Sequence, residues 1–170
     1  TLLRISVNPS GPPYVDWQLS SPALADVDGD GMDEIIFVSS PGGGDSSASK
    51  LWVVNGVETQ GGQSLYGTNV NGFPYTFASA PGEAAPDQIT QSSPAVADIL
   101  ASADGPEILV LTQNFIWMFT TREPQKYVWH KRILQIWGGG DNPLTPSPAI
   151  GDVNGDGSLE IVFGGNKGRL

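Results

Sequence analysis

Two short segments of the sequence carry oxygen-bearing side chains at the same four offsets. Counted from the first aspartate, these side chains stand at positions 1, 3, 5 and 9, and a glycine, Gly31 or Gly157, stands at position 6. The residues at the four positions are Asp26, Asp28, Asp30 and Glu34 in the first segment and Asp152, Asn154, Asp156 and Glu160 in the second. Alternate side chains converge when a chain curls around one point, and glycine permits the positive φ that such a turn requires. Because Ca²⁺ takes six to eight hard oxygen ligands, each segment predicts a calcium-binding loop.

Charge repulsion supports this interpretation. Carboxylates within about 5 Å of one another repel by roughly 1 to 3 kcal/mol per pair at surface-like dielectric constants, and a bound cation removes that cost. The simpler alternative is a hairpin turn without an ion, because Asp-Gly is a favoured turn dipeptide. Two copies with the same spacing to a glutamate favour the metal. An EF-hand or dockerin loop is not favoured, because it needs flanking helices and a bidentate Glu at position 12, where this chain has Phe37 or Phe163.

Each loop belongs to a repeated unit. The tripeptide Ser-Pro-Ala begins at Ser21, Ser93 and Ser147, and an aspartate stands five residues after each of these serines. Each loop then closes on a glutamate that opens an apolar run, at 34–38, 107–111 and 160–163. The length and the β-branched content of these runs predict strands that are buried on both faces.

The middle copy of the loop departs from the pattern. Between Asp98 and Glu107 it has Leu100 at position 3 and one extra residue before the glutamate. We therefore expect no tight calcium site there. Asp104 and Glu107 are expected to serve turn formation and solvation instead.

The spacing of further apolar runs predicts the fold. A second run with a central tryptophan, Trp52 or Trp117, follows each of the first two buried strands, and aromatic stretches at 72–77 and 127–129 come before the next Ser-Pro-Ala. About four strands per unit is the anatomy of a β-propeller blade, and such units must stack to bury their faces. With 22 Gly, 14 Pro and 39% hydrophobic residues, the composition also favours many short strands joined by turns. We therefore predict an all-β β-propeller of four-stranded blades.

The pattern Ser-Pro-Ala-x-x-Asp-x-Asp/Asn-Gly-Asp-Gly-x-x-Glu-Ile resembles the FG-GAP/VCBS repeat family, known from integrin α-subunit propellers and from many bacterial extracellular proteins. The resemblance covers most of residues 12–170. In that family the loop joins the first two strands of a blade and binds Ca²⁺ through the side chains at positions 1, 3, 5 and 9 and the carbonyl at position 7. Carried over to this chain, the resemblance implies two Ca²⁺ sites, in which the carbonyls of Met32 and Ser158 join the side chains named above.

The repeats divide the chain into a single propeller segment of about three blade equivalents. Residues 1–19 would supply strands that complete a neighbouring blade, 20–91 and 92–145 would each form a blade unit, and 146–170 a half blade. Insertions around 41–49 and 61–72 account for the greater length of the first unit. Three blades are too few for a propeller. We expect either a fragment of a longer chain or closure between chains, in which the N-terminal strands complete the last blade of another copy.

Composition and charge narrow the function. A net charge of −10 with only eight Lys and Arg argues against nucleic-acid binding, and no apolar run approaches the roughly 20 residues of a membrane span. There is no cysteine for a disulfide or a thiolate metal site, and the first 25 residues do not resemble a signal peptide, so we expect mature or internal sequence. The hypothesis is a secreted or cell-surface, non-catalytic scaffold, adhesion or assembly module. Its partner would be a protein or glycan at the cell surface, or other copies of itself through blade completion.

Two alternatives stay open. A polysaccharide lyase or hydrolase would need acid–base groups, but the chain has one histidine, His130, and its acidic residues outside the loops show no recognisable pairing. These acidic residues are Asp16, Glu58, Glu83, Asp87, Glu123 and Asp141. A lectin-like module would present exposed aromatic residues, for which Trp137 is the best candidate, whereas the recurrence of Trp52 and Trp117 favours packing between blades. The sequence favours a non-catalytic protein over an enzyme.

Overall fold

The computed structural model describes residues 18–40, 49–56, 69–70, 72–77, 92–100, 105–112, 115–121, 127–132 and 147–164. Within these residues every regular secondary-structure element is a β-strand, which confirms the predicted all-β class. The strands are β1 (Gln18–Leu19), β2 (Ala23–Ala25), β3 (Glu34–Ser40), β4 (Lys50–Val54), β5 (Tyr75–Thr76), β6 (Ala95–Ala97), β7 (Glu107–Leu111), β8 (Phe115–Phe119), β9 (Tyr127–Arg132), β10 (Ala149–Gly151) and β11 (Glu160–Val162).

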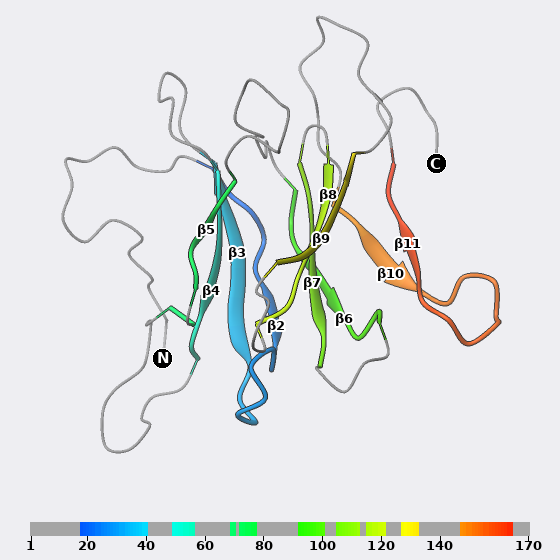
Figure 1. Ribbon diagram of the computed structural model, residues 1–170, viewed down its shortest axis with the longest axis horizontal. Helices are drawn as coiled ribbons and strands as arrows, with labels where there is room; N and C mark the ends of the chain where they lie inside the picture. Colours follow the sequence, from blue (N-terminus) through cyan, green and yellow to red (C-terminus); the bar gives the residue numbers. More distant parts are fainter. Residues whose placement is uncertain are drawn as a thin grey trace, which may run out of the picture.

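The strands form three antiparallel sheets that follow one another along the chain and stand side by side, from left to right in Figure 1. We call these sheets, with their loops, unit 1, unit 2 and unit 3. In unit 1 both β1 and β2 pair with β3, which continues to β4 and β5; unit 2 has the order β6-β7-β8-β9; and in unit 3 β10 pairs with β11. Unit 2 has the four strands predicted per unit, unit 1 has five because β1 and β2 both pair with β3, and the described part of unit 3 has two.

The first two strands lie along the same edge of β3. Leu19 of β1 pairs with Ser39, and Ala23 of β2 pairs with Ile36. Gln18 and Leu19 therefore belong to the sheet of unit 1, although the sequence division placed residues 1–19 with a neighbouring blade. The strands predicted within 1–17 lie outside the described residues, as do 41–48 and 61–68 of the two insertions and Trp137.

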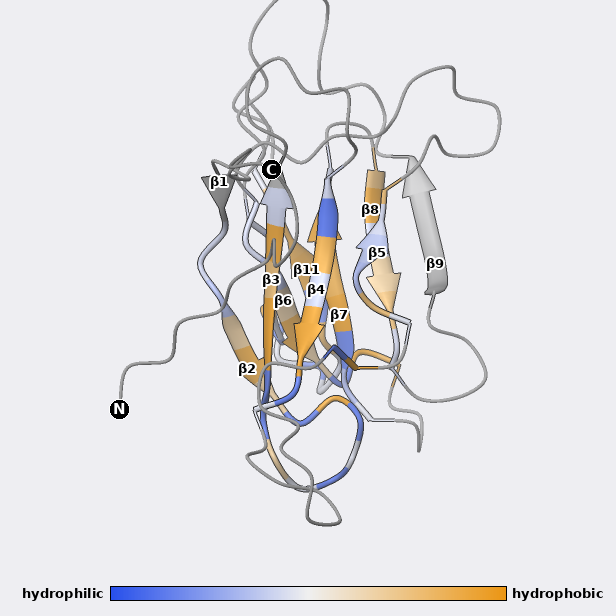
Figure 2. Ribbon diagram, turned by 90° about the vertical axis from the view of Figure 1, so that its left-hand side faces the viewer, coloured by the Kyte–Doolittle hydropathy of each residue, from blue (hydrophilic) through white to orange (hydrophobic). Residues whose placement is uncertain are grey.

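Strand β7 shows how each unit is buried between its neighbours. Its residues alternate, so that Ile108 and Val110 pack in an apolar cluster shared with unit 1, and Leu109 and Leu111 pack in a second cluster shared with unit 3. All five residues of β7 are buried. The prediction that this run is buried on both faces is confirmed for unit 2. In Figure 2 most of the strand residues are hydrophobic, and the loop at the lower end of the sheets is largely hydrophilic.

The two predicted tryptophans occupy equivalent places. Trp52 pairs with Phe37 in unit 1, and Trp117 pairs with Val110 in unit 2. Each indole N–H donates to a hydroxyl two residues beyond that partner, Ser39 Oγ at 2.9 Å and Thr112 Oγ1 at 3.2 Å. Trp117 is buried in the cluster between units 1 and 2, which confirms its predicted role in packing between units.

Candidate metal centre

The two aspartate-rich loops each join a short strand to the strand with which it pairs. Residues 26–33 connect β2 to β3 and residues 152–159 connect β10 to β11, and both loops lie at the lower end of the sheets in Figure 1. Positive φ angles at Gly31 (90°) and Gly157 (87°) confirm the predicted role of glycine at position 6. Gly29 and Gly155, at position 4, also have positive φ, of 81° and 80°, which the sequence analysis did not anticipate.

Backbone N–H groups hold the acidic side chains of the first loop in place. The two carboxylate oxygens of Asp26 accept the N–H of Gly29 at 2.7 Å and of Gly31 at 3.0 Å. Oδ1 of Asp28 accepts the N–H of Asp30 at 3.1 Å. The turn therefore orients these carboxylates through its own backbone.

The loop of unit 3 repeats these contacts at the same offsets. Asp152 accepts the N–H of Gly155 at 2.6 Å and of Gly157 at 2.8 Å, and Oδ1 of Asn154 accepts the N–H of Asp156 at 2.8 Å. The N–H of Gly157, followed by those of Gly155 and its neighbours, lowers the pKa of Asp152 below its usual range. The two loops differ in sequence at positions 3, 7 and 8, and they nevertheless make the same backbone contacts.

Positions 5 and 7 lie at the exposed tip of each loop. Asp30 accepts the N–H of Met32 at 2.9 Å, and Asp156 accepts the N–H of Ser158 at 2.8 Å. The N–H of Ser158 and the amide of Asn154 lower the pKa of Asp156. The side chain of Met32 is exposed, so any contribution of this residue to a bound ion would come from its backbone.

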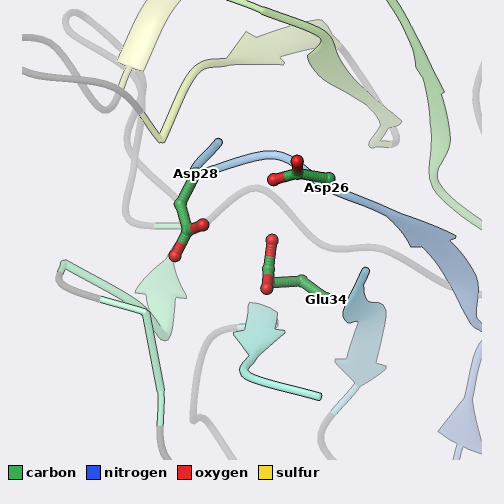
Figure 3. A group of neighbouring side chains, drawn as sticks. All are labelled: Asp26, Asp28 and Glu34. Atoms are coloured by element: carbon green, nitrogen blue, oxygen red, sulfur yellow. The ribbon is translucent and has the colours of Figure 1, made fainter. Parts of the chain in front are cut away.

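Three carboxylates of the first loop converge. Asp26, Asp28 and Glu34 each offer one carboxylate oxygen, and these atoms all lie within 4.8 Å of one another. Figure 3 shows Asp26 and Asp28 extending from the loop, and Glu34 from the beginning of β3, toward a common space. Asp30 is not part of this group.

Glu34 is the buried member of the group. Its side chain is fully buried, Oε2 accepts the N–H of Val27 at 3.0 Å, and Oε1 is buried without a hydrogen-bond partner among the residues that the structure describes. Burial raises the pKa of Glu34 to about 7; the Val27 N–H opposes the rise and the negative charge of Asp28 adds to it. A buried carboxylate oxygen without a donor is costly, and a cation between Glu34, Asp26 and Asp28 would remove that cost. The residues of the first loop therefore fit Ca²⁺.

The loop of unit 3 differs from that of unit 1 at its centre, where Asn154 takes the position of Asp28. Nδ2 of Asn154 donates to Oδ2 of Asp156 at 3.0 Å and to Oε1 of Glu160 at 3.1 Å. An amide N–H₂ thus lies between two carboxylates, where a cation would need an oxygen. Glu160 is only half-buried, and its Oε2 accepts the N–H of Val153 at 2.9 Å, as Glu34 accepts that of Val27. This loop fits Ca²⁺ less well than the first one.

The middle loop satisfies its glutamate with backbone donors. Oε2 of the buried Glu107 accepts the N–H of Ile99 at 2.8 Å and of Leu100 at 3.2 Å. Glu107 therefore serves turn formation, as expected, but not solvation, because its side chain is buried, and Asp104 lies outside the described residues.

A donor shared by all three loops escaped the sequence analysis. The N–H at position 2, from Val27, Ile99 or Val153, donates to the glutamate that closes each loop. The feature of the sequence that could have indicated this contact is the aliphatic residue that follows the first aspartate in every copy of the loop.

Stacked antiparallel sheets with an acidic loop between the first two strands of the unit define a repeat protein of the β class. Residues 19–54, from β1 to the last residue of β4, match the family model described as FG-GAP repeat. The predicted resemblance to FG-GAP repeats is thereby confirmed for unit 1. No curated protein and no solved structure matches the chain significantly. Within the described part of the chain, no helix is long and apolar enough to cross a membrane.

Proposed function

We propose that this chain forms part of an extracellular calcium-binding β-propeller that serves as a non-catalytic scaffold, adhesion or assembly module. In this proposal Ca²⁺ has a structural role: it neutralises the acidic side chains of the loops and fixes the turn between the first two strands of a unit. Loop 26–34 is the stronger site and loop 152–160 the weaker one.

The observation that carries the proposal is the oxygen Oε1 of Glu34. It is buried without a hydrogen-bond partner among the described residues, and Glu34 belongs to a group of three carboxylates in which one oxygen of each lies within 4.8 Å of the others. A carboxylate can be buried when a metal ion or a hydrogen-bond donor compensates its charge. Carboxylate oxygens are also ligands that Ca²⁺ prefers.

The propeller arrangement is supported by how the units stack. Unit 2 packs one face on unit 1 and the other on unit 3, and residues 19–54 match a repeat found in propellers. Because a single sheet cannot bury both faces, such units need neighbours on both sides. The extracellular location is supported by the same repeat, and extracellular calcium modules bind with dissociation constants of about 10⁻⁴ to 10⁻³ M, a range that a shallow loop of this kind can reach. A protein or glycan at the cell surface is the proposed partner.

Calorimetric titration with Ca²⁺, together with thermal unfolding in its presence and absence, tests the calcium site. We expect a rise in melting temperature equivalent to about 2.7 kcal/mol at a hundredfold excess of Ca²⁺ over the dissociation constant. Asp26→Ala should abolish most of this rise and Asp152→Ala a smaller part. A wild-type protein whose melting temperature does not respond to millimolar Ca²⁺ would rule out the calcium role.

A further inference from the structure

Val27 links the acidic loop of unit 1 to unit 2. This residue lies between Asp26 and Asp28 in the sequence, so its backbone carries two of the three carboxylates that converge in the loop. Its own side chain is buried, with 1% of its surface exposed, in the apolar cluster that units 1 and 2 share. The segment that presents the candidate calcium ligands is therefore also part of the contact between two units.

The N–H, the side chain and the carbonyl of Val27 each make a different contact. The N–H donates to Oε2 of Glu34 at 3.0 Å, within the loop. The side chain packs in the shared cluster, to which Phe119 of β8 also belongs. The carbonyl oxygen accepts the hydroxyl of Thr121, which lies two residues after the end of β8. The first contact joins Val27 to the third carboxylate of the group, and the other two join it to unit 2.

The hydrogen bond from Thr121 comes from outside the loop. The bond from the N–H at position 2 to the closing glutamate recurs in all three loops, so it belongs to the loop itself. Thr121, in contrast, stands 94 residues after Val27 in the chain. Its side chain is buried, and a buried carbonyl that loses its donor is costly. Unit 2 thus supplies a hydrogen bond that holds the calcium loop of unit 1 in place.

The loop of unit 2 differs from that of unit 1. Among the residues that the structure describes, unit 2 contains no comparable group of carboxylates, and its Glu107 is held by the N–H groups of Ile99 and Leu100. An effect of Ca²⁺ in loop 26–34 on unit 2 therefore has to pass through the contact between the two units.

We propose that Thr121 is a positioning residue for the calcium site of the neighbouring unit, and that calcium binding in loop 26–34 and the packing of unit 1 on unit 2 strengthen each other through Val27. This inference rests on the proposed calcium role of the loop. The hydroxyl of Thr121 fixes the peptide group between Val27 and Asp28, and the apolar cluster fixes the Val27 side chain. Asp26 and Asp28 are thereby held near Glu34 before the ion binds, which reduces the entropy cost of gathering the three carboxylates. Because coupling between sites is reciprocal, Ca²⁺ in turn stabilises the contact of Val27 with unit 2.

Calorimetric titration with Ca²⁺ tests the role of Thr121. Every protein carries Asp152→Ala, so that the loop of unit 3 is equally impaired in all of them. Thr121→Val removes the hydroxyl and keeps the shape of the side chain, whereas Thr121→Ser keeps the hydroxyl. We expect Thr121→Val to raise the calcium dissociation constant of loop 26–34 about tenfold, and Thr121→Ser to leave it close to the value of the Asp152→Ala parent.

Thr112→Val is the matched control. Thr112 is another buried threonine of unit 2, and its hydroxyl contacts Phe115 and Trp117 where β7 ends and β8 begins, at the other end of the sheet from Thr121. The substitution should lower the melting temperature and leave the calcium dissociation constant unchanged. A loss of affinity in Thr121→Val that came only from lower stability would appear in Thr112→Val as well.

Hydrogen exchange of the Asp152→Ala protein measures the reverse effect and needs no substitution in unit 2. Ca²⁺ should slow the exchange of amides at residues 118–121, near loop 26–34, more than at residues 110–112, at the other end of the sheet. A protein that binds no Ca²⁺ in this loop would overturn the proposed function together with this inference. Calcium binding of equal strength in the parent and in Thr121→Val, or equal slowing of exchange at both ends of unit 2, would overturn this inference alone.

Discussion

Oε2 of Glu34 accepts the N–H of Val27 at 3.0 Å, while Oε1 of the same carboxylate is buried without a partner among the described residues. The glutamate is therefore tied to the loop by one oxygen, and its carboxylate lies close to those of Asp26 and Asp28. Removing the charge of Glu34 should therefore raise the folding stability of the calcium-free protein and abolish the stabilisation by Ca²⁺.

Glu34→Gln is expected to raise the stability of the calcium-free protein at pH 8 and to abolish its calcium response. The glutamine can still accept the Val27 N–H, and it removes a buried negative charge whose pKa is raised to about 7. Scanning calorimetry with and without Ca²⁺ measures both effects. Asp33→Asn is the matched control, because it removes one charge from an exposed side chain of the same loop that is not in the carboxylate group. Loss of calcium-free stability in Glu34→Gln, with the calcium response intact, would contradict this account.

The pH dependence of calcium binding follows from the same residue. In the calcium-free protein Glu34 has a folded pKa of about 7 against an ordinary value of 4.5, so its contribution to stability is present below about pH 4.5 and is lost as the pH rises through 7. The difference corresponds to roughly 3 kcal/mol. Bound Ca²⁺ needs the ionised carboxylate and must displace this proton.

We therefore expect apparent calcium affinity to fall below pH 7, with close to one proton released per ion at pH 6 and little release at pH 8. Titration calorimetry in buffers of different ionisation enthalpy counts the protons. In Glu34→Gln the proton release should disappear. Equal release at both pH values in the wild-type protein would show that Glu34 does not titrate with binding.

The spacing of the acidic residues predicted the conformation of the loops, but it did not predict how the two candidate calcium sites differ. Spacing alone indicated which side chains the turn would gather and where glycine must take a positive φ, because these depend on residues within the loop. It could not distinguish Glu34, fully buried, from Glu160, half-buried, because that difference depends on the units that pack around each loop. The direction of the Asn154 amide was likewise beyond the pattern, which treats Asp and Asn at position 3 as equal.

In the fold as well, features that depend on residues close in the sequence were predicted, and a contact between residues far apart in the sequence was not. Strand β7 and the equivalence of Trp52 with Trp117 followed from runs of apolar residues, each of which is a local signal. The hydrogen bond from the N–H of Ser21 to Oγ of Ser93 was not predicted, because these serines are 72 residues apart and meet only when the units stack. Ser-Pro-Ala marked the repeat in the sequence, and the structure shows that its serine also joins neighbouring units.

Asn154→Asp should strengthen calcium binding at the third loop. The substitution replaces the amide N–H₂ that now bridges Asp156 and Glu160 with an oxygen, and gives the loop the same side chain as Asp28 in unit 1. We expect the calcium dissociation constant of this loop to fall by about tenfold, which is about 1.4 kcal/mol. Without calcium the variant should be less stable than the wild type, because three carboxylates then repel one another.

Calorimetric titration of Asn154→Asp in an Asp26→Ala background isolates the third loop. The comparison is with Asp26→Ala alone, so the first loop is equally impaired in both proteins. Unchanged affinity in the double variant would mean that the third loop does not bind Ca²⁺ through position 3.

Ser147→Ala should loosen unit 3 from unit 2. It removes the hydroxyl that accepts the N–H of Ser93 at 2.9 Å, a hydrogen bond between units 2 and 3. A hydrogen bond of this kind contributes about 1 kcal/mol, so denaturant unfolding should show a loss of that size with an unchanged slope. Ser21→Ala is the matched control, because it removes the equivalent serine hydroxyl, for which the structure gives no bond to another unit among the described residues. Hydrogen exchange should then report faster exchange of β10 and β11 amides in Ser147→Ala than in Ser21→Ala, whereas equal exchange in the two variants would show that the hydrogen bond from Ser93 to Ser147 does not hold unit 3 in place.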